Sequence, residues 1–164
     1  LSTYNDFENT EVYCFDLWNA YQYVITRNKY IQYALKKLLP ASFSKKLSLR
    51  LVKKNLTLFN IPNDIVKFVY GNSTITIPEF FDEHPSLLFD YILVDGGHDK
   101  YTAETDLNNV VAFVKSGGII IFDDIGPKGW NLYDVWQKFK IKYNEDFIFY
   151  ENLHRKGVAW AIKK

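Results

Sequence analysis

The chain of 164 residues contains one cysteine, Cys14, and no methionine. A single cysteine excludes an internal disulfide, so we predict an intracellular, cytoplasmic protein. One cysteine and three scattered histidines also exclude a zinc site with the usual ligand spacing. Because translation starts with methionine, we expect that Leu1 is not the natural N-terminus and that the beginning of the protein is missing.

Other absences narrow the range of partners. No apolar run is long enough to cross a bilayer, and no signal peptide opens the chain. The formal net charge is +1, which gives no electrostatic reason to expect binding to nucleic acid or to an anionic membrane. There is no Gly-x-x-x-x-Gly-Lys phosphate loop and no Gly-x-Ser-x-Gly nucleophile elbow. We therefore expect a small-molecule substrate, no nucleic acid and no membrane.

The sequence alternates between segments typical of strands and segments typical of helices. The predicted strands are 12–15, 65–70, 89–94, 119–122, 147–150 and 158–162, and the predicted helices are 20–39, 44–59, 101–114 and 132–143. Gly117-Gly118 is expected to end the third of these helices. The alternation predicts one α/β domain over residues 1–164, with a mostly parallel sheet and helices on both faces. The last two strands have no helix between them, which predicts an antiparallel C-terminal hairpin.

Polar residues follow each predicted strand of the parallel part. They are Asp16, Gly71-Asn72-Ser73, Asp95-Gly96-Gly97-His98 and Asp123-Asp124. In sheets of this class ligands bind beyond the carboxyl ends of the strands. We therefore expect these residues to lie at one edge and to form a binding or catalytic site.

Two of these strand ends indicate particular chemistry. The Asp16 carboxylate can accept hydrogen bonds from both hydroxyls of a ribose, although capping of the next helix is an alternative role. Gly96 and Gly97 allow a sharp turn that brings Asp95 and His98 together. Imidazole is the side chain that most often serves as a general base, so His98 can remove a proton from a substrate hydroxyl. The alternative is a tight turn with His98 exposed and without function.

Asp123 and Asp124 are a candidate metal site together with Asp95. Neighbouring residues of a strand point to opposite faces, but the strand ends here and a bend can direct both toward the site. Oxygen-only ligands suit Mg²⁺. Capping around Gly126-Pro127 is the alternative. Trp130 can stack on a flat ligand, although packing in the core or at the rim is expected for any single aromatic residue of this chain.

Taken in order, these motifs resemble a known family. The central block of the chain resembles the C-terminal half of class I S-adenosylmethionine-dependent methyltransferases. This block consists of the segment 89–98, then Tyr101, Asp106, Gly117-Gly118, the apolar run 119–122 and Asp123-Asp124. Within that class they are most similar to the small O-methyltransferases typified by macrocin and other macrolide-sugar methyltransferases. Gly71-Asn72-Ser73 and the final segment 157–162 also match. The resemblance covers about residue 11 to the end.

The resemblance implies a Rossmann-like methyltransferase sheet and assigns roles to residues. The implied cofactor-binding set is Asp16, Leu17, Gly71, Asn72, Ser73, Asp95 and Gly96, with Asp16 on the ribose and Asn72 and Ser73 near the adenine. The implied metal ligands are Asp95, Asp123 and Asp124, and the metal is Mg²⁺ or a similar ion. His98 is the implied general base, with Asp95 beside it.

The family begins with a strand and a glycine-rich loop, and nothing before Val12 supplies them. We therefore expect a sheet whose first strand and glycine loop are missing through truncation, with apolar strand edges exposed and weak cofactor binding. A degenerate domain is the alternative.

The hypotheses for function are an O-methyltransferase acting on a small hydroxylated molecule, such as a sugar, and a non-catalytic methyltransferase-like domain used for binding or assembly. The long segment 20–59 is a candidate lid or dimer contact, so a homo-oligomer is a further hypothesis.

Overall fold

The computed structural model describes residues 10–16 and 41–164. The chain divides into two compact units, residues 1–72 and 73–164, and each is described by itself. Leu17 and the helix expected at 20–39 lie outside the described residues. The prediction that one domain spans the whole chain therefore stays a prediction.

The described residues of the first unit form two parallel strands and one long helix. Strand β1 (Val12–Asp16) pairs with β2 (Val66–Tyr70), and the register runs from Val12 opposite Val66 to Asp16 opposite Tyr70. Helix α3 (Ala41–Leu58) and the short 3-10 helix η1 (Asn63–Ile65) lie between them in the sequence. Both strands were expected from their β-prone composition, and their parallel pairing confirms the parallel sheet predicted for this part of the chain.

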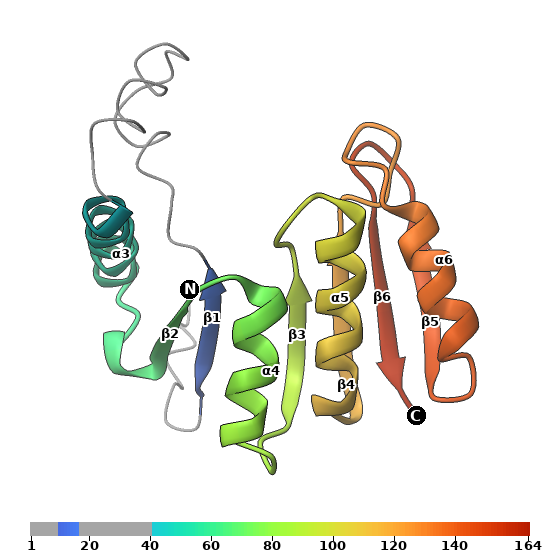
Figure 1. Ribbon diagram of the computed structural model, residues 1–164, viewed down its shortest axis with the longest axis horizontal. Helices are drawn as coiled ribbons and strands as arrows, with labels where there is room; N and C mark the ends of the chain where they lie inside the picture. The colour runs from blue at the N-terminus through green and yellow to red at the C-terminus, as the bar shows by residue number, and fades with distance from the viewer. Residues whose placement is uncertain (1–9, 17–40) are drawn as a thin grey trace, which may run out of the picture. The chain divides into compact units, whose positions relative to one another are not determined.

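The second unit contains a four-stranded sheet in the order β3-β4-β6-β5. In chain order its elements are α4 (Ser73–Glu83), β3 (Phe89–Val94), α5 (Lys100–Val110), η2 (Val111–Phe113), β4 (Val114–Asp123), α6 (Tyr133–Lys142), β5 (Phe147–Asn152) and β6 (Val158–Lys163). Strands β3 and β4 are parallel, whereas β6 is antiparallel to both of its neighbours. The expected antiparallel ending is confirmed. Within this unit α4, α5 and α6 lie on the same side of the sheet (Figure 1).

The core of this unit follows the alternation of side chains along the central strands. Ile120 and Phe122 on β4 are buried beneath the helices, and so is Trp136 of α6. The Trp136 ring stacks on Phe122, with ring centroids 6.2 Å apart, and on Phe139 at 5.6 Å. Burying a large apolar side chain contributes roughly 1.5–3 kcal/mol, so this aromatic cluster fixes α6 on the sheet.

The position of Gly117-Gly118 corrects one prediction. Helix α5 ends at Val110, and both glycines lie inside β4 rather than at the end of a helix. The register between β3 and β4 shifts here, because Phe89 pairs with Val114 but Tyr91 pairs with Ile119. Gly117 has a φ of +77°, and a Cβ at Gly118 would lie 3.1 Å from the carbonyl oxygen of Asp90. The glycines therefore allow a bulge in a strand, where close backbone approach excludes a side chain.

Candidate functional site at the strand ends

In the first unit the predicted cofactor-binding residues lie at the carboxyl ends of both strands. The N–H of Gly71 donates a hydrogen bond to the backbone carbonyl of Asp16, with an N···O distance of 3.2 Å. Gly71 has a φ of +150°, a conformation that favours glycine, and the exposed Asn72 follows it. Asp16, Gly71 and Asn72 are thus brought together, as expected for parallel strands. Their role in cofactor binding stays a prediction.

In the second unit Ser73, the first residue of α4, is tied to Asp106 of α5. The Ser73 Oγ donates a hydrogen bond of 2.8 Å to Asp106 Oδ2. Asp106 is 3% exposed, and burial raises the pKa of its carboxyl group, an effect that the Ser73 hydrogen bond partly offsets. A Cβ at Gly96 would lie 3.2 Å from the same Oδ2 atom. Asp106 therefore lies against the turn that follows β3, a position that the sequence did not predict for it.

The turn after β3 needs glycine at Gly97 and is closed by a cap. A Cβ at Gly97 would lie 2.5 Å from Thr102 Cγ2, which is too close for any side chain. The Asp99 carboxylate accepts a hydrogen bond of 2.9 Å from the N–H of Thr102 and caps the start of α5. Sequence reasoning missed Asp99, although an aspartate just before a helical pattern is a usual capping signal. The tight turn places Asp95 and His98 at the end of β3.

Asp124 joins this turn from the end of β4. Its backbone has a φ of +62°, and only 2% of the residue is exposed. Its Oδ2 lies 3.4 Å from His98 Nδ1, and its Oδ1 lies 3.3 Å from Lys156 Nζ. Asp95, His98 and Asp124 each offer one ligand atom, and these atoms lie within 4.8 Å of one another. We call these three residues the acidic cluster.

The structure thus separates the two acids that end β4. Asp123 is half-buried and does not belong to the cluster, in which His98 is the third member instead. The left-handed backbone at Asp124 is the bend that allows this residue to turn toward Asp95. The prediction that Asp123 binds a metal stays a prediction.

Charge and ring stacking shape the cluster. Burial raises the pKa of the Asp95 carboxyl group, and the charges of Asp123 and Asp124 raise it further. The contact with the negatively charged Asp124 raises the pKa of Lys156. The exposed ring of Trp130 stacks on His98, with centroids 4.8 Å apart and ring planes 5° apart. Trp130 therefore covers one face of the imidazole rather than filling the core.

The donor set of the cluster fits a divalent ion. Two carboxylates and an imidazole converge, and Oδ1 of the buried Asp124 has no hydrogen-bond partner among the described residues apart from its ion pair with Lys156. The Lys156 ammonium group already offsets part of the cost of burying this carboxylate, so the fit to a metal ion rests on the three converging donor atoms. Mg²⁺ and Mn²⁺ both accept ligands of this kind.

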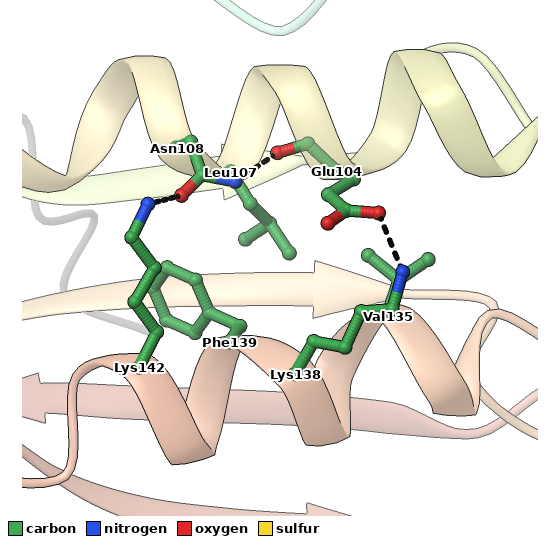
Figure 2. Close-up of a pocket in the computed structure, with 7 residues that line it drawn as sticks. All are labelled: Glu104, Leu107, Asn108, Val135, Lys138, Phe139 and Lys142. Carbon is green, nitrogen blue, oxygen red and sulfur yellow. Dashed lines mark hydrogen bonds and ion pairs between the residues drawn. The ribbon is translucent and has the colours of Figure 1, made fainter.

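A separate crevice lies between α5 and α6 and does not belong to this site. Figure 2 shows its lining, in which Lys138 pairs with Glu104 at 3.1 Å and Lys142 donates to Asn108 at 2.6 Å. Its volume is about 60 Å³, far below the ~300–1,000 Å³ of ordinary ligand pockets. It is lined by no residue of the acidic cluster, and we assign it a structural role.

Comparison with known proteins identifies the class. A family model described as a methyltransferase domain matches residues 1–125, and the chain therefore belongs to this family of S-adenosylmethionine-dependent methyltransferases. A search of curated proteins by sequence found no match.

Solved structures share the fold at low identity. The O-methyltransferase NovP is 17% identical with a TM-score of 0.62, and the match covers 95% of this chain and 61% of NovP. CalS11, a TDP-rhamnose 3'-O-methyltransferase of calicheamicin biosynthesis, is 14% identical with a TM-score of 0.54, covering 93% and 58%. An rRNA methylase from Streptococcus thermophilus is 11% identical with a TM-score of 0.52, covering 93% and 73%. The chain thus spans about three fifths of the length of NovP and CalS11.

These findings confirm the predicted class I, Rossmann-like methyltransferase fold. In the part of the chain that the structure describes, no helix is long and apolar enough to cross a membrane.

Proposed function

We propose that the chain is an O-methyltransferase that transfers a methyl group from S-adenosylmethionine to a hydroxyl group of a small molecule, such as a sugar. The observation that carries this proposal is the contact between the His98 imidazole and the buried Asp124 carboxylate at the ends of β3 and β4. An O-methyltransferase benefits from such a pair, because a hydroxyl oxygen becomes a better nucleophile as its proton is removed.

His98 is the proposed general base. The Asp124 carboxylate lies 3.4 Å from Nδ1 and favours the ring form that carries its hydrogen there, so that Nε2 remains to accept the substrate proton. Stacking on Trp130 restricts rotation of the ring. Bound S-adenosylmethionine would supply the methyl group from its sulfonium, and His98 would accept the proton that the acceptor hydroxyl loses.

Mg²⁺ is the proposed metal, with the Asp95 and Asp124 carboxylates as its ligands and Asp123 as a third candidate. Mg²⁺ prefers oxygen ligands, and such an ion leaves the His98 nitrogen available as a base. The ion would add positive charge beside the acceptor hydroxyl and so favour loss of its proton.

The first unit supplies the proposed ribose ligand. Asp16 is exposed at the end of β1, and the hydrogen bond from Gly71 fixes the backbone at that strand end. Asn72, Ser73, Asp95 and Gly96 complete the proposed cofactor-binding set in the described residues. The Ser73 hydrogen atom is already donated to Asp106, so its oxygen is left as an acceptor.

The test is a methyl-transfer assay on the full-length protein with nucleotide sugars, catechols and rRNA as acceptors, with and without a chelator. We expect transfer to a small hydroxylated acceptor, and a fall in kcat of roughly 10²–10⁴-fold for His98→Gln, the range ascribed to a general base. The matched control is His154→Gln, which changes an exposed histidine outside the cluster and should leave kcat unchanged.

Each part of the proposal has its own failing result. Full activity of His98→Gln would contradict the role of His98 as general base. Activity that a chelator does not change would contradict the role of Mg²⁺. Methylation of rRNA alone contradicts a small-molecule substrate. Binding of S-adenosylmethionine with no transfer to any acceptor favours the non-catalytic binding domain instead.

A further inference from the structure

Lys156 places a cation directly beside the acidic cluster, from the loop that joins β5 to β6. Its Nζ lies 3.3 Å from Oδ1 of Asp124, on the side of the carboxylate away from the oxygen that faces His98. The lysine side chain is 68% exposed, whereas Asp124 is 2% exposed. Among the described residues, the Lys156 ammonium group is the one formally charged cation that pairs with the Asp124 carboxylate.

The backbone holds Lys156 at this position. Its carbonyl oxygen accepts a hydrogen bond from the N–H of Gly126, and the carbonyls on either side accept from Ile125 at 3.3 Å and from Lys128 at 3.1 Å. A Cβ at Gly126 would lie 2.6 Å from the Lys156 carbonyl carbon. The loop that carries Lys156 is thus bonded to the loop that carries Asp124. These bonds fix the backbone of Lys156 beside the cluster, so that its side chain starts within reach of Asp124.

We propose that Lys156 is the internal counter-cation of the acidic cluster, and that its ammonium group and a divalent metal ion compete for Asp124. This inference rests on the proposed metal site and adds a residue that sets its affinity. A carboxylate oxygen that faces an ammonium group is less available to a metal ion, and the two positive charges repel each other. Metal binding therefore requires Lys156 to move its side chain away from Oδ1.

The proposal predicts that loss of the Lys156 charge strengthens metal binding. We expect Lys156→Met to bind Mn²⁺ about tenfold more tightly than the wild type, the order expected for removing one unit charge next to a solvent-facing site. Lys156→Arg keeps the charge and should bind as weakly as the wild type. Lys128→Met removes the same charge from the facing loop and should leave Mn²⁺ affinity within about twofold, because its ammonium group has no contact with Asp124 in the described residues.

The measurement is Mn²⁺ binding by electron paramagnetic resonance, together with the rise in melting temperature that Mn²⁺ causes in each variant. Tighter binding by Lys156→Met than by Lys128→Met supports the proposal, including the case in which the wild type shows no binding at all. Equal Mn²⁺ affinities in the wild type and Lys156→Met overturn the role of Lys156 but leave the metal site intact. If Lys156→Met binds no Mn²⁺, or binds it no better than Asp124→Asn does, the metal site itself is refuted and Lys156 with it.

Discussion

Removal of the Glu151 carboxylate should loosen the attachment of α6 to β5. Glu151 accepts hydrogen bonds from four side chains of that helix: Trp136 Nε1 at 2.8 Å, Tyr133 Oη at 3.0 Å, Lys140 Nζ at 3.1 Å and Gln137 Nε2 at 3.3 Å. Trp136 is fully buried, so in Glu151→Ala its N–H loses its partner away from bulk water. Leaving a buried donor unpaired costs about 1–3 kcal/mol. The partly exposed Lys140 adds little, because exposed ion pairs contribute about 0–1 kcal/mol.

We therefore expect Glu151→Ala to lower the free energy of unfolding by about 2 kcal/mol, or the melting temperature by roughly 4–8 °C. The assay is urea unfolding followed by circular dichroism. Lys140→Ala is the matched control and should cost less than about 1 kcal/mol. The reasoning is refuted if Glu151→Ala unfolds within about 0.5 kcal/mol of the wild type, or if Lys140→Ala costs as much, since the buried indole would then not be the deciding group.

The Glu151 carboxylate should also make the free energy of unfolding depend on pH in the acidic range. Burial alone would raise the pKa of Glu151, but the hydrogen bonds from Lys140, Tyr133 and Trp136 outweigh it and lower the pKa. A folded-state pKa below the unfolded value of about 4.3 gives stability that is fully present above that value. This contribution is lost as the pH falls through the folded-state pKa. In Glu151→Gln that part of the acid dependence should disappear.

Two further predictions concern the turn and the ring beside the acidic cluster. Gly97→Ala should lower both stability and kcat, because the new Cβ meets Thr102 Cγ2 at 2.5 Å, and Thr102→Ser should recover part of the loss by removing that methyl group. A Gly97→Ala variant as active and as stable as the wild type would contradict the turn geometry. Trp130→Ala should lower kcat about two- to twelvefold, the rate equivalent of the ~0.5–1.5 kcal/mol of an aromatic pair, and leave the affinity for S-adenosylmethionine unchanged. An unchanged kcat would show that the stack does not hold His98 in place.

The sequence predicts the elements of the second unit well where the pattern is local. The segment Phe89–Val94 is an apolar run interrupted only by Asp90, and the strand has these same bounds. The C-terminal hairpin also follows from the sequence, since no helical pattern separates its two strands. Such features depend on neighbouring residues alone.

The Gly117-Gly118 pair shows where local reasoning fails. Two glycines after a helical pattern are typical of a helix end, yet the same pair is suited to a bulge in a strand. What decides between these is the pairing of Val114 with Phe89 on a distant strand, which draws the residues before the glycines into β4. No signal near Gly117 reports that pairing.

The residues of the acidic cluster and its neighbours also differ in how far the sequence predicts their positions. Asp95 and His98 share one short turn and were predicted together. Trp130 and Lys156 reach the same place from two later loops, and the stack on His98 and the ion pair with Asp124 exist only in the folded chain. Composition favoured packing for any one aromatic residue, so the exposed stack of Trp130 had no sequence signal.

Asp124 is the residue for which the fold itself argues a functional role. A non-glycine residue with a left-handed backbone costs roughly 1–2 kcal/mol, and Asp124 has a φ of +62°. A carboxylate that is 2% exposed adds a desolvation cost, which its two neighbours at 3.3 and 3.4 Å offset only in part. Glycine at this position would remove both costs. These two costs support the proposed role of Asp124 as a fixed anion between the His98 imidazole and the Lys156 cation.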